Sequence, residues 1–241
     1  MIISGKNSVF EAVNSGGKTL NKVIICNSVF DETSKKVVSL AKSKGVRVEF
    51  LDRKIMDKMC DHHQGYIAEV TDFVYCQTDD ILKVAEDKGE DPLLIILDGI
   101  EDPHNLGSIV RVCECAGAHG IIIQNRRCCA VNDTVFKTSC GAINHVKIAR
   151  VTNINDEIER LKKKNIWVYC ADMDGDNMFK SNLTGAIAVV IGSEGKGVSV
   201  LTKKLCDGCI SIPMYGKVNS LNASTAATAV VYEIVRQRNF K

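Results

Sequence analysis

Short apolar runs alternate with amphipathic stretches over the first part of the chain. The stretch Asp31–Lys44 predicts a helix, because its apolar residues recur at helical spacing and Gly45 follows its end. Strands are expected at Lys22–Cys26, Arg47–Leu51 and Tyr66–Val70, and a short helix at Lys54–Cys60. This order predicts a compact α/β unit within the first 75 residues.

The composition changes after this unit. The stretch Thr78–Pro92 contains eight acidic or basic residues and little large apolar surface. Such a stretch is typical of a linker, here with a short surface helix. We therefore expect an N-terminal domain of residues 1–75, a linker of residues 76–91 and a second domain of residues 92–241.

The second domain repeats the alternation of strands and helices. Its first run, Leu93–Leu97, is continuously apolar, as in a parallel strand that is buried on both faces. Further strands are expected at Gly120–Ile123, Val146–Ala149, Ile166–Ala171, Ala186–Ile191 and Cys209–Pro213, and helices at Asn105–Ala116, Asn132–Thr138, Asn155–Lys164 and Ser220–Arg236. Repeated alternation predicts a mostly parallel sheet with helices on both faces. The pattern alone favours an open doubly wound sheet, since knotted chains are nearly absent from proteins.

Two of these strands run into loops of glycine and small polar residues. Gly192–Gly197 follows the first of them, and Met214–Asn222 follows the second. Open α/β sheets bind ligands beyond the carboxyl ends of their strands, and glycine lets a backbone approach a ligand closely. We therefore expect the two loops to form one composite site.

Net charge gives little information about the partner. A formal charge of +2 means that any nucleic-acid surface would have to be a local basic patch. Candidate basic residues are Arg126, Arg127, Lys162–Lys164, Lys203, Lys204, Arg236 and Arg238. The run Lys162–Lys164 ends an expected helix, where cations stabilise the helix dipole, so we favour a structural role for it.

The eleven cysteines are expected to be reduced, because the first residues lack the layout of an export signal. Cys206 and Cys209 form the only C-x-x-C pair and lack the second pair of a zinc site, so no metal is expected. No apolar run is long enough to span a membrane. These features predict a cytoplasmic protein with no membrane association.

Three ordered motifs resemble those of the SpoU (TrmH-type) family of RNA ribose 2′-O-methyltransferases. They are Asp98–Arg111 (DGIEDPHNLGSIVR), Gly192–Gly197 (GSEGKG) and Ile212–Ser224 (IPMYGKVNSLNAS). The N-terminal part is similar to the substrate-binding domain of the ribosomal-RNA (RlmB-like) branch of that family, at Gly5–Val9 and His63–Gly65. Because Lys137–Ala142 also matches that branch, the resemblance covers nearly the whole chain.

The resemblance implies a fold and an activity that the pattern alone does not. The fold would be a SPOUT-type α/β knot, with a C-terminal trefoil knot and a smaller N-terminal α/β domain that binds RNA. The activity would be transfer of a methyl group from S-adenosylmethionine to a ribose 2′-hydroxyl of RNA, most simply of a guanosine in 23S ribosomal RNA. Members of the family are homodimers, and the same is expected here.

The resemblance also assigns site residues by their positions in the motifs. The implied catalytic residues are Asn105, Arg111, Glu194, Ser220 and Asn222, and the implied cofactor contacts are Gly192, Ile212, Met214 and Leu221. Without the resemblance, Asn105 could simply cap a helix, Arg111 could be a surface cation and Glu194 could be solvated. With it, we expect Glu194 to hold the Arg111 guanidinium by a charge-assisted pair. Ser220 is expected to cap the terminal helix.

The terminal helix is expected to contribute to the homodimer interface. It carries more apolar surface than one helix at a domain edge needs to bury. The residues concerned are Ala223, Ala227, Val230, Val231 and Ile234.

Three other functions stay open at this point. A non-catalytic RNA-binding or ribosome-assembly factor of the same fold is disfavoured by the intact polar set at Asn105, Arg111, Glu194 and Asn222. A transfer-RNA 2′-O-methyltransferase is disfavoured by the additional N-terminal domain, which that branch of the family lacks. A nucleotide-binding Rossmann enzyme is disfavoured because no G-x-G-x-x-G follows the first strand of either domain.

Overall fold

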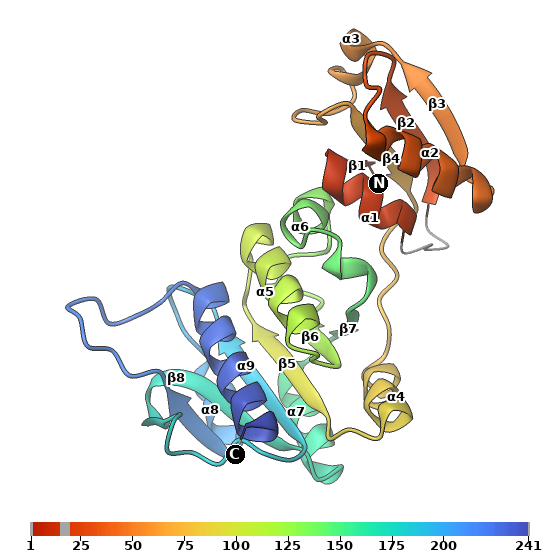
Figure 1. Cartoon of the computed structure of the whole chain (residues 1–241). Helices are drawn as coiled ribbons and strands as arrows, with labels where there is room; N and C mark the ends of the chain where they lie inside the picture. The colour runs from red at the N-terminus through yellow and green to blue at the C-terminus, as the bar shows by residue number, and fades with distance from the viewer. Residues whose placement is uncertain (1, 15–19, 241) are drawn as a thin grey trace. The chain divides into compact units, whose positions relative to one another are not determined.

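The computed structural model describes residues 2–14 and 20–240, and the chain divides into two units (Figure 1). The N-terminal unit contains Met1–Val74 together with Val131–His145, and the second unit contains Tyr75–Ala130 and Val146–Lys241. These ranges differ from the expected domains in two places. Residues 76–91 belong to the second unit, and residues 131–145 belong to the N-terminal unit although they lie far along the chain.

The N-terminal unit is built on a four-stranded sheet in the order β1-β4-β2-β3. Strands β2 and β3 are parallel, and β4 is antiparallel to both of its neighbours. The elements are β1 (Ile2–Ser4), α1 (Lys6–Asn14), β2 (Leu20–Cys26), α2 (Glu32–Ser43), β3 (Arg47–Leu51), α3 (Arg53–Met56), β4 (Tyr66–Val70), α6 (Asp133–Thr138) and the 3₁₀ helix η1 (Ala142–Asn144). The three predicted strands are confirmed, whereas β1 and α1 were not predicted.

The returning segment at residues 131–145 packs closely on the start of the chain. Helix α6 contacts β1, and Gly141 has a φ of +92°. A Cβ at Gly141 would lie 2.4 Å from the Cβ of Glu11, so no side chain fits there. Glycine is therefore needed at this position for the segment to lie against α1.

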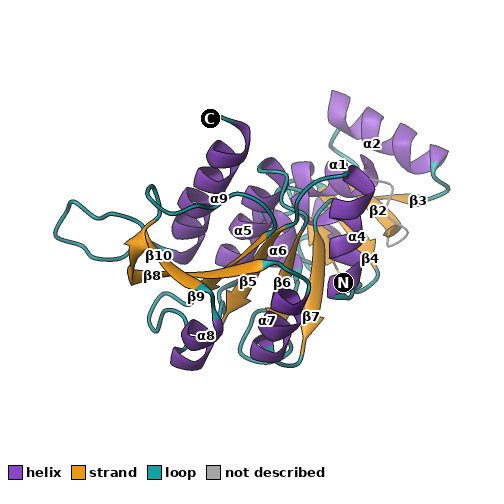
Figure 2. Ribbon diagram, turned by 90° about the horizontal axis from the view of Figure 1, so that it is seen from below, coloured by secondary structure: helices purple, strands orange, loops and turns teal. Residues whose placement is uncertain are grey.

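The second unit is built on a six-stranded sheet in the order β10-β8-β9-β5-β6-β7, and every neighbouring pair is parallel. Its elements are α4 (Thr78–Lys88), β5 (Leu93–Asp98), α5 (Pro103–Cys115), β6 (Gly120–Gln124), β7 (Lys147–Val151), α7 (Ile154–Lys163), β8 (Trp167–Asn177), β9 (Ile187–Gly192), α8 (Val200–Leu205), β10 (Gly208–Ser211) and α9 (Ala223–Asn239). Helices α5 and α9 cover one face, and α7 and α8 cover the other (Figure 2). The predicted parallel sheet is confirmed, and α8 is an unpredicted helix.

Helix α4 occupies the expected linker and packs onto the sheet. Ile81 and Ala85 lie one turn apart and are buried, while the charged residues around them face outwards. A Cβ on Gly120 would lie 2.7 Å from the Ile81 side chain, so this glycine lets the helix approach β6. The composition of this stretch is that of a linker, but two buried apolar residues at helical spacing are enough to anchor it to the sheet.

The apolar residues of α9 are buried within this chain. Val230, Val231 and Ile234 are fully buried, and Ala223 and Ala227 are also buried. The helix packs against α5 and β9. The expectation that this stripe faces a partner subunit is therefore wrong, because the stripe already forms part of the core.

The basic residues at the end of α9 also have structural partners. Arg236 forms an ion pair with Glu233 at 2.8 Å. Arg238 donates hydrogen bonds to the carbonyl oxygens of Asp91 and Pro92, each at 2.9 Å, and to that of Gly185. Arg238 therefore fastens the last helix to the domain, whereas the ion pair of Arg236 lies within α9 itself.

Candidate functional site

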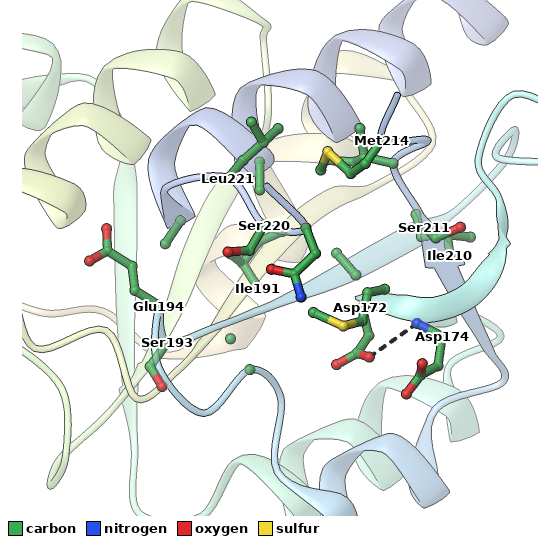
Figure 3. A pocket seen from close by; sticks show the side chains of 18 of the residues that line it. Asp172, Asp174, Ile191, Ser193, Glu194, Ile210, Ser211, Met214, Ser220 and Leu221 are labelled. Carbon is green, nitrogen blue, oxygen red and sulfur yellow. Dashed lines mark hydrogen bonds between the residues drawn. The ribbon is translucent and has the colours of Figure 1, made fainter. Parts of the chain in front are cut away.

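A cavity of about 700 Å³ lies at the carboxyl ends of β9 and β10 and against residues 171–174 within β8 (Figure 3). Parallel strands end at one edge of a sheet, so the loops after them meet there. The lining comes from residues 171–174, 191–197, 210–214 and 219–221, with Lys203, Ala223 and Ala226. Its size is within the range of small-molecule sites. The expectation of one composite site from two glycine-containing loops agrees with this cavity.

The loop after β9 closes tightly on itself. Ser193 and Gly197 form an isolated antiparallel bridge, and the Gly197 N–H donates to the Ser193 carbonyl oxygen at 2.9 Å. A Cβ at Gly192 would lie 2.1 Å from the carbonyl carbon of Gly197, which no structure tolerates. Gly197 has a φ of +64°, in the left-handed region that favours glycine. The two glycines therefore fix where Glu194 is held.

Strand β8 makes a wide excursion at the cavity. On β10 the neighbouring residues Cys209 and Ile210 pair with Cys170 and Asp176 of β8, so residues 171–175 bulge out of the pairing with β10, while Ala171 still pairs with Ile191 of β9. A Cβ at Gly175 would lie 2.6 Å from backbone atoms of β10, so glycine lets the chain return to the sheet. The excursion forms one wall of the cavity.

That wall carries two carboxylates. Asp172 is largely buried and forms an ion pair with Lys203 at 2.6 Å. The hydrogen bond from Lys203 to Asp172 raises the pKa of the lysine, so the cation persists at every physiological pH. The Asp174 N–H donates to Asp172 Oδ1 at 3.3 Å, as the dashed line in Figure 3 shows.

A network of amides and one carboxylate joins three elements beside the cavity. Asn105 Nδ2 in the first turn of α5 donates to Glu194 Oε1 at 2.9 Å. Asn222 Nδ2 donates to Asn105 Oδ1 at 2.9 Å and also to Glu194 Oε1. Asn105 is buried, whereas Glu194 is exposed at the loop. The network ties the loop after β9 to the starts of α5 and α9.

The cap of α9 differs from expectation, and the alternative role of Asn105 as a helix cap is not found. Asp102, not Asn105, caps α5 by accepting from the His104 N–H at 2.9 Å. Asn222, not Ser220, caps α9, because Asn222 Oδ1 accepts from the Ser224 N–H at 2.9 Å. Because Asn105 does not cap α5, both its Nδ2 and its Oδ1 can bond to Glu194 and Asn222.

Most of the predicted site residues meet at this cavity. Its lining includes Gly192, Glu194, Ile212, Met214, Ser220 and Leu221. Asn105 and Asn222 join the group through Glu194. Arg111 is an exposed residue of α5, about 9 Å along the helix and about 240° around it from Asn105. The contact between Arg111 and Glu194 stays a prediction.

Sequence reasoning assigns no role to Asp172, Met173 and Asp174, which line the cavity. Lys203 also lines it but is predicted only as a candidate for a basic patch. The signal for the first three is the alternation of acidic residues, D-M-D-G-D, directly after an apolar strand. The strand predicted from the apolar run ends at Ala171, so the residues after it have no predicted role.

Several candidate basic residues are ion-paired within the second unit. Lys162 pairs with Asp207 at 2.8 Å, and Lys164 pairs with Asp79 at 3.2 Å. Arg126 and Arg127, in contrast, have exposed side chains in the loop after β6. The Arg127 carbonyl oxygen lies 3.9 Å from a Cβ built on Gly99, and Ser193 lies 3.7 Å from the same point. This arginine pair therefore lies at the same edge of the sheet as the cavity.

Two negative findings apply to residues 2–14 and 20–240. No three His, Cys, Asp or Glu side chains in these ranges are grouped so as to hold a metal ion. No helix there is both long and apolar enough to cross a membrane.

Comparison with known proteins gives matches over both units. Residues 92–232 match the SpoU rRNA methylase family, and residues 2–76 match the substrate-binding domain of RNA 2′-O ribose methyltransferases. The Bacillus subtilis protein YacO, named for the TrmH family of tRNA/rRNA methyltransferases, is 44% identical over 98% of this chain and 96% of its own length. A relative from Staphylococcus saprophyticus, named for the same family, is 40% identical over 100% of this chain and 97% of its own.

A solved structure matches as well. The SpoU methyltransferase AviRb of Streptomyces viridochromogenes, in complex with the cofactor AdoMet, superposes with a TM-score of 0.83. It is 26% identical, and the match covers 98% of this chain and 90% of AviRb.

The closure of the loop after β9 yields a test by glycine replacement. Gly192→Ala should lower the free energy of unfolding by about 1–3 kcal/mol, because the methyl group must displace the backbone at Gly197. Gly195→Ala is the matched control, since a Cβ there meets nothing within 4 Å, and it should change stability by less than about 0.5 kcal/mol. Urea unfolding measures both. Equal stability of the two variants would contradict the close approach at Gly192.

Proposed function

Because the chain belongs to the SpoU family of RNA methylases, we propose that it methylates the 2′-hydroxyl of a guanosine in 23S ribosomal RNA, with S-adenosylmethionine as methyl donor. The chain is an RNA methyltransferase of that family, and the family uses S-adenosylmethionine. The observation that carries the proposal is the cavity at the ends of β9 and β10 and beside β8, with Glu194 at its rim held by two asparagines.

The residues present fit this cofactor. Met214 and Leu221 are apolar and partly exposed at the cavity, as expected for surfaces that cover an adenine ring. Because Asp172 is paired with Lys203, Asp174 leaves a net negative charge on the opposite wall, which suits a ligand that carries a sulfonium and an ammonium group. Gly192 and Ile212 are assigned as further contacts through their backbone atoms. The cofactor supplies a methyl group on a positively charged sulfur, which makes that methyl carbon electrophilic.

The protein has to position the acceptor. A ribose hydroxyl is a weak nucleophile at neutral pH, so its oxygen must be held in line with the methyl carbon. Asn105, Glu194 and Asn222 hold the loop after β9 in one place through their mutual hydrogen bonds. We assign Ser220, on the loop before α9, to the acceptor side of the cavity.

Arg111 is assigned to the RNA backbone. A guanidinium stays protonated in proteins, so it serves as a fixed cation and not as a base. On this assignment Arg111 binds the phosphate next to the target ribose, and Glu194 orients the guanidinium once RNA is present. Arg126 and Arg127 extend the positive charge along the same edge of the sheet.

The ribosomal substrate is supported by the N-terminal unit. It matches the substrate-binding domain of RNA 2′-O ribose methyltransferases over residues 2–76. A further unit adds surface that can contact RNA beyond the modified ribose, which suits a large RNA. We also assign a trefoil knot to the C-terminal segment, on the basis of the family's fold.

We assign a homodimer as the active form. Its support is the loop between β10 and α9, which exposes large apolar side chains that do not line the cavity. Tyr215 is 95% exposed and Val218 is 74% exposed. Exposed apolar side chains gathered beside a binding site are typical of surfaces that a partner covers.

The first test of the function is transfer of the methyl group itself. Purified protein with methyl-labelled S-adenosylmethionine and deproteinised 23S ribosomal RNA should produce a 2′-O-methylguanosine, located by mass-spectrometric mapping. Transfer RNA serves as the competing substrate. Label only in transfer RNA would overturn the ribosomal assignment, and no label in either RNA would overturn the proposed activity.

The second test separates cofactor binding from chemistry. Arg111→Ala should bind S-adenosylmethionine as tightly as the unmodified protein but lower the methyl-transfer rate by on the order of 10²-fold, because the RNA is no longer held in line. Calorimetry in the presence of a chelator measures binding, and single-turnover transfer measures the rate. Loss of cofactor affinity in step with activity would show that Arg111 is structural.

The third test concerns assembly. The unmodified chain should sediment as a dimer at micromolar concentration, and Val218→Glu should shift it to a monomer, because a two-fold interface contains each residue twice. Val200→Glu is the matched control, since Val200 on α8 is 72% exposed. A monomeric unmodified protein would contradict the proposal whatever the variants do.

A further inference from the structure

Four chain segments of the N-terminal unit lie at one edge of its sheet. Strands β2 and β3 are parallel, so the loops after both begin there. Strand β4 is antiparallel to β2 and to β1, so the start of β4 and the end of β1 lie at the same edge. The Gly5 N–H donates to the Tyr66 carbonyl oxygen at 3.1 Å, which joins these last two segments. We call this the loop edge; it contains residues 5–6, 27–31, 52–57 and 62–65.

The turn before β4 has an unusual backbone. His62 and Gln64 have φ angles of 56° and 53°, although neither is glycine. Such conformations cost free energy and persist only where the surroundings impose them, which is most often at functional sites. Both side chains are exposed. The turn therefore presents an imidazole and an amide to solvent in a fixed geometry.

His63 imposes that geometry from within. It is 2% exposed, and its Nδ1 accepts a hydrogen bond from the Gly65 N–H at 2.9 Å. Because Nδ1 is an acceptor, the proton lies on Nε2, which donates to Asp57 Oδ1 at 2.8 Å. The histidine thus connects the turn before β4 with the loop after β3.

The segments of the loop edge also contact one another directly. A Cβ at Gly65 would lie 2.5 Å from Val29 Cγ2, so the turn packs directly on the loop that carries Phe30. The side chain of Phe30 is nevertheless 81% exposed. Asn27 Nδ2 donates to Asp52 Oδ1 at 3.0 Å, which links the loop after β2 to the loop after β3.

The groups at this edge match the chemistry of an unpaired nucleotide. A cavity of about 290 Å³ is lined by Arg53, Asp57, His62, His63 and Gln64. Arg53 offers a guanidinium for a phosphate, and the aromatic ring in the adjacent loop offers a face on which a base can stack. Gln64 Oε1 accepts from the Lys6 N–H at 3.2 Å, so the Nε2 of this amide and the His62 imidazole are the groups that can form hydrogen bonds with the edge of a base.

We propose that the loop edge binds an unpaired nucleotide of the RNA substrate, with Phe30 stacked on the base, Arg53 on the phosphate and Gln64 on the base edge. The proposal rests on the proposed function in one respect, because it takes RNA to be the substrate. It concerns binding only and involves no step of methyl transfer.

The charge contribution is tested by Arg53→Ala in the full-length protein. The probe is a fluorescently labelled single-stranded RNA oligonucleotide of mixed sequence, and its anisotropy is followed over a range of salt concentrations. Arg53→Ala should weaken binding about 10-fold and reduce the slope of log affinity against log salt by about 1. Lys42→Ala removes the same charge from the exposed last turn of α2, at the other end of the sheet, and should leave affinity and slope unchanged. Equal effects of the two variants would overturn the proposal.

The stacking contribution is tested by two replacements of Phe30. Phe30→Leu should weaken binding of the single strand about 10-fold and leave binding of a duplex of the same sequence unchanged, whereas Phe30→Tyr should keep the affinity of the unmodified protein. Equal losses for single strand and duplex, or no loss, would overturn the stacking role. Methyl transfer by the unmodified protein is measured separately. If the unmodified protein is inactive but the variants still show these binding losses, the proposed function is refuted and the nucleotide-binding role of the loop edge is supported.

Discussion

The close approach of Gly192 to Gly197 is the constraint on which the site depends. No side chain fits between Gly192 at the end of β9 and the backbone of Gly197, where the loop turns back, so the loop has one shape. That shape brings Glu194 to the asparagines that begin α5 and α9. It also directs the chain onwards to Ser199, whose N–H donates to Asp98 Oδ2 at 2.9 Å at the end of β5. One steric requirement thus connects two neighbouring strands, β9 and β5, with two helices around the same cavity.

The two units use the same principle in different ways. In the second unit the sheet is entirely parallel, so successive loops meet at one edge without further arrangement. In the N-terminal unit the sheet is mixed, and the loop edge arises because an antiparallel strand begins where two parallel strands end. In both units buried polar side chains, Asn105 in one and His63 in the other, fix exposed groups in place. Polar residues that are buried and fully bonded are well suited to this task.

Much of this organisation could be predicted from the sequence, because it depends on local signals. The apolar runs predicted most of the strands, and the motifs indicated that Asn105, Glu194 and Asn222 belong together. What could not be predicted depends on contacts between distant segments. The return of residues 131–145 to the N-terminal unit requires Gly141 to meet Glu11, and no local pattern encodes such a pairing. Similarly, the apolar stripe of α9 indicated burial but not whether this chain or a second copy would cover it.

The excursion of β8 separates the shape of the cavity from the stability of the sheet. Cys170 and Asp176 pair with successive residues of β10, so the hydrogen-bonded ladder continues on either side of residues 171–175. Substitutions at the exposed positions Met173 and Asp174 change what a ligand meets while leaving strand pairing intact, provided that Gly175 is kept for the return. This arrangement gives evolution a segment in which ligand recognition can be altered independently of folding.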